Sequence, residues 1–139
     1  MQPGVTHAAR SRNLPPMYPG QHAIDHPDRP VVIMAGSGLT ITYREYEAKA
    51  NQIAHLFRSI GLVRGDHIAI LMENNPAMLL VEAAAERCGL FFTCLNSYLT
   101  GPESAYIVND SQSKVFVSSN AKAASALEEI GRASCRERV

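Results

Sequence analysis

Short runs of apolar residues alternate with stretches of helical periodicity along most of the chain. The first two runs, Val31–Met34 and Leu39–Thr42, flank the tetrapeptide Ala35-Gly36-Ser37-Gly38. Glycine adopts the positive φ angles of tight turns without steric cost, so this tetrapeptide predicts an antiparallel hairpin. Beyond the hairpin, strand-like and helix-like segments follow one another, which is typical of βαβ units.

The first long helix is predicted to begin at Tyr43. Thr42 and Glu45 have the spacing of a capping box, in which the two side chains satisfy backbone N–H groups at the helix start. Gly61 supplies a C-terminal stop. The apolar positions in between form one stripe that is expected to face the core: Tyr46, Ala50, Ile53, Ala54 and Phe57.

The segment His67–Met72 is apolar without alternation, as expected for a parallel strand that is covered on both faces. Asn75 as N-cap and Pro76 as first helical residue then open a second helix, which Gly89 closes. This helix is apolar nearly all round and is expected to be buried between layers. Its polar positions, Glu82, Glu86 and Arg87, are expected to form a solvated rim.

The pattern repeats in the remaining third of the chain. Leu90–Leu95 predicts another strand, and Thr100 with Glu103 repeats the capping-box spacing before a third helix. Lys114–Val117 predicts a further strand, and Asn120–Ile130 a final helix. Together these elements predict an α/β fold, a layered and mostly parallel sheet with helices on its faces.

Composition narrows the classes of function. The chain has 139 residues, of which 46% are apolar and 19% charged, so it can bury a core. Lys plus Arg (13) equals Asp plus Glu (13), which gives no basic field for nucleic acid as a partner. No apolar run reaches the ~20 residues of a transmembrane segment. Cys88, Cys94 and Cys135 form no CxxC pair, which favours a cytoplasmic protein, including one peripheral to the inner face of the membrane.

Three parts of the chain differ in composition. Residues 1–18 are rich in proline and lack the apolar core of a signal peptide, so they are expected to be a flexible lead-in. Residues 19–130 carry the α/β pattern. Residues 131–139 crowd three arginines around Cys135 without periodicity, and we expect this tail to be non-native.

Most candidate sites have a simpler structural interpretation. Gly36-Ser37-Gly38 lacks the third glycine of a dinucleotide-binding loop and precedes a strand, so a hairpin turn explains it. His22 and His26 have helical metal-ligand spacing, but no third ligand is evident and Pro27 follows. Glu82 and Glu86 could form an acid–base pair, or simply the rim described above. No serine lies in a GxSxG elbow, and Cys88 is expected to be a small core residue.

The loop Asn96–Thr100 is the best local candidate for a binding site, because it follows a predicted strand at the carboxyl edge, where open α/β sheets form ligand crevices. The alternative is a βα loop in which Thr100 only caps the next helix.

Four segments in this order and spacing resemble the opening of the adenylate-forming acyl-CoA synthetases, over about residues 19–130. They are Leu39–Tyr46; Gly65–Leu71 with Asn75-Pro76; Gly89–Asn96; and Leu99-Thr100 with Glu103 and Tyr106–Asp110. The stretch Leu95–Asp110 looks more like fatty or aryl acid CoA ligases than peptide-synthetase adenylation domains.

The resemblance implies the first part of a large N-terminal α/β domain, incomplete here, in an enzyme that uses ATP and Mg²⁺ to convert a fatty or aryl acid to an acyl-adenylate and then to a CoA thioester. The family's phosphate loop, ribose-binding Asp and catalytic Lys have no match in this sequence, so no catalytic, cofactor-binding or metal-binding residue is assigned. The resemblance therefore implies that this segment is scaffold and has no enzymatic activity by itself. The alternative is a small non-catalytic α/β binding or interaction module. A sheet cut in this way is also expected to expose Ile68, Ile70, Phe91 and Phe92 beside a free edge.

Overall fold

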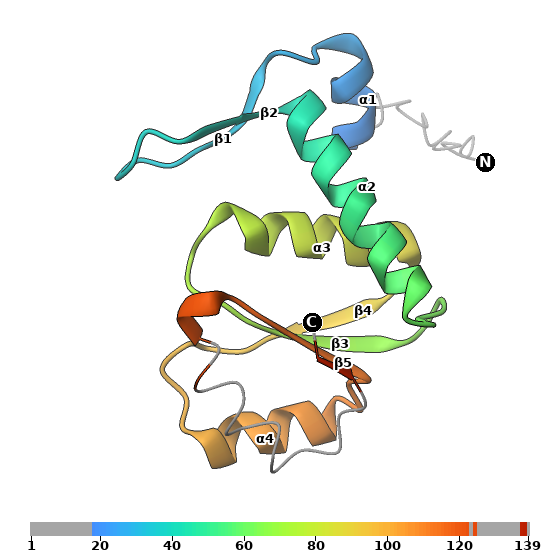
Figure 1. Cartoon of the computed structure of the whole chain (residues 1–139), viewed down its shortest axis with the longest axis vertical. Coiled ribbons are helices and arrows are strands. Elements are labelled where there is room, and N and C mark those ends of the chain that lie inside the picture. Colours follow the sequence, from blue (N-terminus) through green and yellow to red (C-terminus); the bar gives the residue numbers. More distant parts are fainter. Residues whose placement is uncertain (1–17, 123, 125–136, 139) are drawn as a thin grey trace, which may run out of the picture.

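The computed structural model describes residues 18–122, 124, 137 and 138. A central parallel sheet lies between helices, and a separate two-stranded hairpin projects from the other end of the molecule (Figure 1). The predicted α/β architecture is therefore confirmed, with helices on both faces of a mostly parallel sheet. No helix in the described ranges is long and apolar enough to cross a bilayer.

The chain enters through a short helix, α1 (Pro19–Asp25), and then forms the hairpin of β1 (Pro30–Ile33) and β2 (Thr40–Thr42). The two strands pair antiparallel, with Ile33 opposite Thr40. Gly38 adopts a φ of 72°, and its N–H donates to the carbonyl of Met34 at 2.8 Å. The glycine-containing tetrapeptide is thus a turn, as predicted.

Helix α2 (Tyr43–Ser59) begins at the predicted capping box. The Glu45 carboxylate accepts from the Thr42 backbone N–H at 2.9 Å, and Thr42 Oγ1 accepts from the Glu45 N–H at 3.3 Å. Four of the five stripe residues are buried: Tyr46, Ala50, Ala54 and Phe57. Burial of a side chain as large as Phe57 stabilises the fold by about 1.5–3 kcal/mol.

The main sheet has the strand order β4-β3-β5-β6. Its central strand, β3 (His67–Leu71), pairs in parallel with β4 (Phe91–Cys94) on one side and with β5 (Val115–Ser118) on the other. Ile70 therefore lies between Cys94 and Val117 in the register. The outer strand β6 (Glu137–Arg138) runs parallel to β5.

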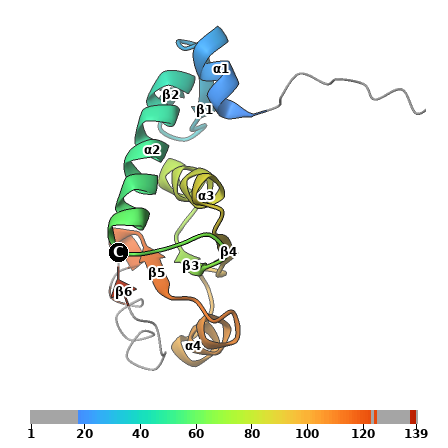
Figure 2. The same cartoon turned by 90° about the vertical axis from the view of Figure 1, so that its right-hand side faces the viewer.

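Helices α3 (Pro76–Cys88) and α4 (Gly101–Asp110) cover opposite faces of this sheet (Figures 1 and 2). Alternate residues of β3 therefore pack into two different hydrophobic clusters, one on each face of the sheet. Ile68 and Ile70 pack with Phe57 of α2 and with Val81 and Ala84 of α3. Ala69 and Leu71 pack with Val108 of α4 and with Phe116 of β5.

The expected exposure of the sheet is confirmed for some residues and wrong for others. Ile68 and Ile70 are 0% and 1% exposed, because α2 and α3 cover the face that was expected to be open. Phe91 is 61% exposed and Phe92 is partly buried. The burial of Ile68 and Ile70 agrees instead with the unbroken apolar pattern of His67–Met72, which predicts a strand covered on both faces.

The end of the chain is described only in part. After β5 a short 3₁₀ helix covers Asn120–Lys122, while most of the predicted helix Asn120–Ile130 lies outside the described residues. Residues 1–17 of the expected lead-in also lie outside them, as does most of 131–139. The non-native origin of residues 131–139 stays a prediction.

Candidate functional site

The carboxyl ends of β3 and β5 form a switch point in the sheet. The chain leaves β3 through α3 to reach β4 on one side, and then returns through α4 to β5 on the other side of β3. In open α/β sheets, ligands bind at the point where the connections diverge in this way. The residues that follow these strands are therefore the first place to look for a site.

Glu73, just after β3, bridges the two strand ends at this switch point. Its Oε2 accepts from Ser119 Oγ at 2.5 Å, and its Oε1 accepts from Asn75 Nδ2 at 3.1 Å. The Ser119 hydroxyl is the main cause that holds the pKa of Glu73 below its usual range. Glu73 therefore stays negatively charged at neutral pH.

The same network orients the cap of α3. Because Asn75 donates through Nδ2 to Glu73, its Oδ1 faces the helix and accepts from the N–H groups of Ala77 at 2.8 Å and Met78 at 3.2 Å. The predicted N-cap is thus confirmed. The first N–H groups of α3 are satisfied from within the chain, so this helix start does not offer them to an anion.

The loop Asn96–Thr100 forms a turn and a helix cap. Asn96 Oδ1 accepts from the Tyr98 N–H at 3.0 Å, and the Glu103 carboxylate accepts from Thr100 N and Oγ1 at 2.9 and 2.7 Å. The Thr100 hydroxyl and backbone lower the pKa of Glu103. The side chain of Tyr98 is exposed. These contacts agree with the second interpretation of this loop, in which Thr100 caps the next helix.

Lys122 joins this loop to the end of β5. Its Nζ donates to the carbonyl of Ser97 at 3.1 Å. The loops that follow β3, β4 and β5 are thus tied to one another by Glu73–Ser119 and by Lys122–Ser97. Sequence reasoning missed both contacts, because each joins residues far apart in the chain and neither pair forms a local motif.

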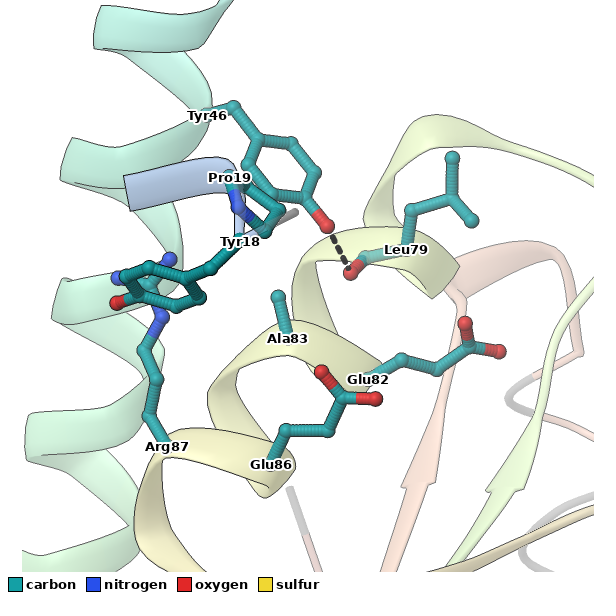
Figure 3. Close-up of a pocket in the computed structure, with 8 residues that line it drawn as sticks. All are labelled: Tyr18, Pro19, Tyr46, Leu79, Glu82, Ala83, Glu86 and Arg87. Carbon is teal, nitrogen blue, oxygen red and sulfur yellow. Dashed lines mark hydrogen bonds between the residues drawn. The ribbon is translucent and has the colours of Figure 1, made fainter. Parts of the chain in front are cut away.

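A cavity of about 450 Å³ lies between the start of α1, α2 and α3 (Figure 3). Tyr46 forms part of its wall and donates its hydroxyl to the Leu79 carbonyl at 3.0 Å. Burial raises the pKa of Tyr46, so the hydroxyl remains a donor. The remaining lining residues are Tyr18, Pro19, Glu82, Ala83, Glu86 and Arg87. The predicted carboxylate pair, Glu82 and Glu86, thus lies at the wall of this cavity.

The expected rim is only partly confirmed, because Arg87 is not a solvated residue. Its guanidinium donates to both carboxylate oxygens of Glu47 at 2.6 Å and to Asn51 Oδ1 at 2.7 Å, and its side chain is 10% exposed. The guanidinium also lies 5.9 Å from the centre of the Tyr18 ring. Arg87 therefore joins α2 to α3 from the cavity wall, while Glu86 remains exposed.

The remaining candidates are the histidine pair and the cysteines, and their surroundings are those of residues with a structural role. His22 and His26 lie with ring centres 6.5 Å apart, and no group of three potential metal ligands occurs within the described ranges. Cys88 Sγ lies 3.5 Å from the Ala54 carbonyl and packs against the core, as expected. Burial and the carboxylate of Glu82 raise the pKa of Cys94 to about 11, so its thiol is unreactive at neutral pH. Cys135 lies outside the described residues.

Comparison with known proteins decides the family. The model of the AMP-binding enzyme family matches residues 21–139, which is most of the chain. The chain belongs to the AMP-binding enzyme family. Its relatives include acyl-CoA ligases, and its fold matches the N-terminal part of such enzymes, as the sequence resemblance indicated.

Two relatives of this chain have names that refer to long-chain fatty acids. The long-chain-fatty-acid–CoA ligase FadD13 of Mycobacterium tuberculosis is 29% identical over 97 residues, which are 70% of this chain and 19% of that protein. The long-chain fatty acid transport protein 1 of Bos taurus is 31% identical over 105 residues, or 76% of this chain and 16% of that protein. The chain thus spans less than a fifth of the length of these relatives.

Solved structures of AMP-binding enzymes share the fold. A Mycobacterium tuberculosis fatty acyl CoA synthetase superposes with a TM-score of 0.78 at 24% identity, over 87% of this chain and 25% of that chain. The Bacillus subtilis O-succinylbenzoate coenzyme A synthetase, in complex with AMP, gives 0.75 at 22% identity over 87% and 30%. At these identities the likeness establishes the fold alone.

The AMP-binding family implies ATP and CoA, whose phosphates need cationic side chains or free N–H groups. At the carboxyl edge described here, the main polar groups have partners within the chain. Glu73 is anionic, Lys122 donates to a backbone carbonyl, and the starts of α3 and α4 carry caps formed by Asn75 and Glu103. The groups named here are thus hydrogen-bonded within the chain.

Proposed function

We propose that these residues are scaffold within an acyl-CoA ligase of the AMP-binding family. The complete enzyme would activate a fatty or aryl carboxylate with ATP, with Mg²⁺ as counter-ion, and transfer the acyl group to CoA. Fatty acids are the first substrate class to test, because the names of FadD13 and of the bovine relative refer to long-chain fatty acids. A cytoplasmic location is part of this proposal, and the free thiols of Cys88 and Cys94 support it.

The observation that supports the scaffold role is the set of hydrogen bonds at the switch point of the sheet. At the position where an α/β sheet ordinarily binds a ligand, the carboxylate of Glu73 is bonded to Ser119 and Asn75, and both flanking helix starts are capped. These groups tie the strand ends to one another. The chemistry would then come from residues outside this segment.

The test compares the complete protein with the 139-residue chain. Each is incubated with ATP, Mg²⁺, CoA and one of three acids, octanoate, palmitate or benzoate, while pyrophosphate and acyl-CoA are measured. We expect the complete protein to release pyrophosphate and form the thioester with at least one acid, and the 139-residue chain to do neither. Pyrophosphate release by the 139-residue chain would contradict the scaffold role, and a complete protein inactive on all acids would contradict the ligase assignment.

A further inference from the structure

The wall of the cavity between α1, α2 and α3 carries two carboxylates that no cation balances. Glu82 and Glu86 lie one turn apart on α3 at this wall (Figure 3). Arg87, which also lines the cavity, is already bonded to both carboxylate oxygens of Glu47 at 2.6 Å. Neither Glu82 nor Glu86 forms an ion pair with any residue that the structure describes. The wall therefore has a net negative charge near neutral pH.

Glu82 and Glu86 also have few hydrogen-bond partners of their own. Glu82 is partly buried, and its Oε1 accepts from Cys94 Sγ at 3.5 Å. A thiol is only a weak donor, so this contact compensates little of the charge. Glu86 is exposed. Because like charges one helical turn apart repel each other, a cation placed between the two carboxylates would relieve this repulsion.

The rest of the cavity suits the organic part of such a cation. The rings of Tyr18 and Tyr46 contribute to its wall, and the methyl group of Ala83 lies between them and the carboxylates (Figure 3). The guanidinium of Arg87 already lies 5.9 Å from the centre of the Tyr18 ring, which shows that a cation is accommodated beside this ring. The volume of about 450 Å³ is within the range of small-molecule sites.

We propose that this cavity binds an organic cation, a protonated primary amine that carries an aromatic or aliphatic group. The ammonium would donate to the carboxylates of Glu82 and Glu86, while the apolar group would pack against Tyr46 and Ala83. The ligand would thereby connect α3 to the start of α1, which supplies Tyr18. The inference goes beyond the proposed function and does not rest on it, because the cavity uses none of the groups at the switch point of the sheet.

A metal ion or an anion fits the cavity less well. A metal site needs three or more ligating side chains, and no such group occurs among the residues with a described position. An anion would be repelled by Glu82 and Glu86, and the guanidinium of Arg87 is already occupied by Glu47. A cation with an apolar group uses both the charge and the rings of the wall.

Isothermal titration calorimetry with 2-phenylethylamine tests the proposal, on the complete protein and on the 139-residue chain. This amine is protonated at neutral pH, and 2-phenylethanol is its neutral analogue. We expect the amine to bind both proteins with a dissociation constant of about 1 mM or lower, and the alcohol to bind about tenfold more weakly or worse. Equal affinities for the amine and the alcohol would overturn the proposal, as would the absence of amine binding to the complete protein.

Glutamine variants test the two carboxylates. Glu82→Gln and Glu86→Gln keep the shape of the side chain and remove its charge, so each should weaken amine binding by about tenfold and leave alcohol binding unchanged. The control is Asp110→Asn, which removes an exposed carboxylate of α4 on the opposite face of the sheet. An equal loss in Asp110→Asn would show that the amine responds only to overall charge, and would overturn the proposal.

Methyl NMR spectra locate the bound amine. The Ala83 methyl group, at the wall of the cavity, should shift during the titration, whereas the buried Ala105 methyl group of α4 should not. A shift at Ala105 without one at Ala83 would place the amine elsewhere and overturn the proposal.

The thioester assay on the same preparation separates this inference from the proposed function. Amine binding at Ala83 in a complete protein without ligase activity would support the cation site and refute the activity. An active ligase that does not bind the amine would do the reverse.

Discussion

Arg87 on α3 binds Glu47 on α2 through both Nη atoms, each 2.6 Å from a carboxylate oxygen. The Arg87 side chain is 10% exposed and that of Glu47 is 24% exposed, so water screens this pair less than a surface ion pair. A second ion pair, Arg44 with Asp28, has side chains that are 64% and 83% exposed. The two pairs provide a matched comparison within one fold.

Arg87→Met should lower the free energy of unfolding by about 2 kcal/mol, since it removes charged hydrogen bonds while keeping much of the aliphatic stem. The measurement is urea denaturation followed by circular dichroism. The control, Arg44→Met, should cost no more than about 0.5 kcal/mol because its pair is solvated. Equal losses in the two variants would show that the Arg87 pair contributes no more than a surface contact.

Gly89→Ala should destabilise the end of α3. Gly89 adopts a φ of 67°, which costs an L-residue about 1–2 kcal/mol, and an added Cβ would lie 2.9 Å from Cγ of Arg64. The control is Gly36→Ala in the hairpin turn, where an added Cβ meets no atom within 4 Å. Thermal unfolding should show a lower midpoint for Gly89→Ala alone, and an unchanged midpoint would contradict the strain argument.

Ala84→Leu should disrupt the packing of α3 against α2 and the sheet. Ala84 is 0% exposed and lies in the cluster with Phe57 and Ile68, so the larger side chain has no space and should cost about 1–3 kcal/mol. Ala77→Leu, at an exposed position of the same helix, is the control and should change little. The comparison uses urea midpoints, and a stable Ala84→Leu variant would mean that this interface adjusts without loss.

Acid should unfold the protein partly through Asp66. Lys114 donates to Asp66 Oδ1 and the Val63 N–H donates to Oδ2, and these two contacts lower the pKa of Asp66. The folded protein therefore binds this proton less readily than the unfolded chain does. The stabilisation is complete above the unfolded pKa of about 4 and is lost as the pH falls through the lower folded value.

Asp66→Asn, which stays neutral at every pH, should flatten the dependence of unfolding free energy on pH below about 4. Lys114→Met removes the main cause of the shift and should flatten it as well. Urea denaturation over a series of acidic buffers measures both slopes. Slopes equal to that of the unsubstituted protein would show that Asp66 does not contribute.

The helix ends and the central strand were predicted well, because the sequence signals for them are local. The Thr42–Glu45 box, the Asn75-Pro76 start and the Gly89 stop all mark the helix ends observed, because each depends on backbone groups only a few residues away. The central position of His67–Leu71 was also predicted, since an unbroken apolar strand must be covered on both faces.

Contacts between distant residues could not be predicted in the same way. Glu47 and Arg87 are 40 residues apart, and Glu73 and Ser119 are 46 apart, so neither pair has a spacing that marks it. The identity of the helices that cover Ile68 and Ile70 likewise could not be predicted, because the amphipathic stripe does not specify where α2 packs. The cavity at Tyr18 and Tyr46 arises from three helices together, and no spacing in the sequence predicted it.

Helix α2 runs from the hairpin down to the sheet (Figure 2). Ala50 belongs to the cluster that contains Ile41 of the hairpin. Ala54, one turn later, belongs to the cluster on the face of the sheet that α3 covers, and Ile53 packs against both clusters. A rotation of the hairpin relative to the sheet would therefore require this helix to bend or to separate from one cluster. The position of the hairpin is thus coupled through α2 to the face of the sheet that carries Ile68 and Ile70.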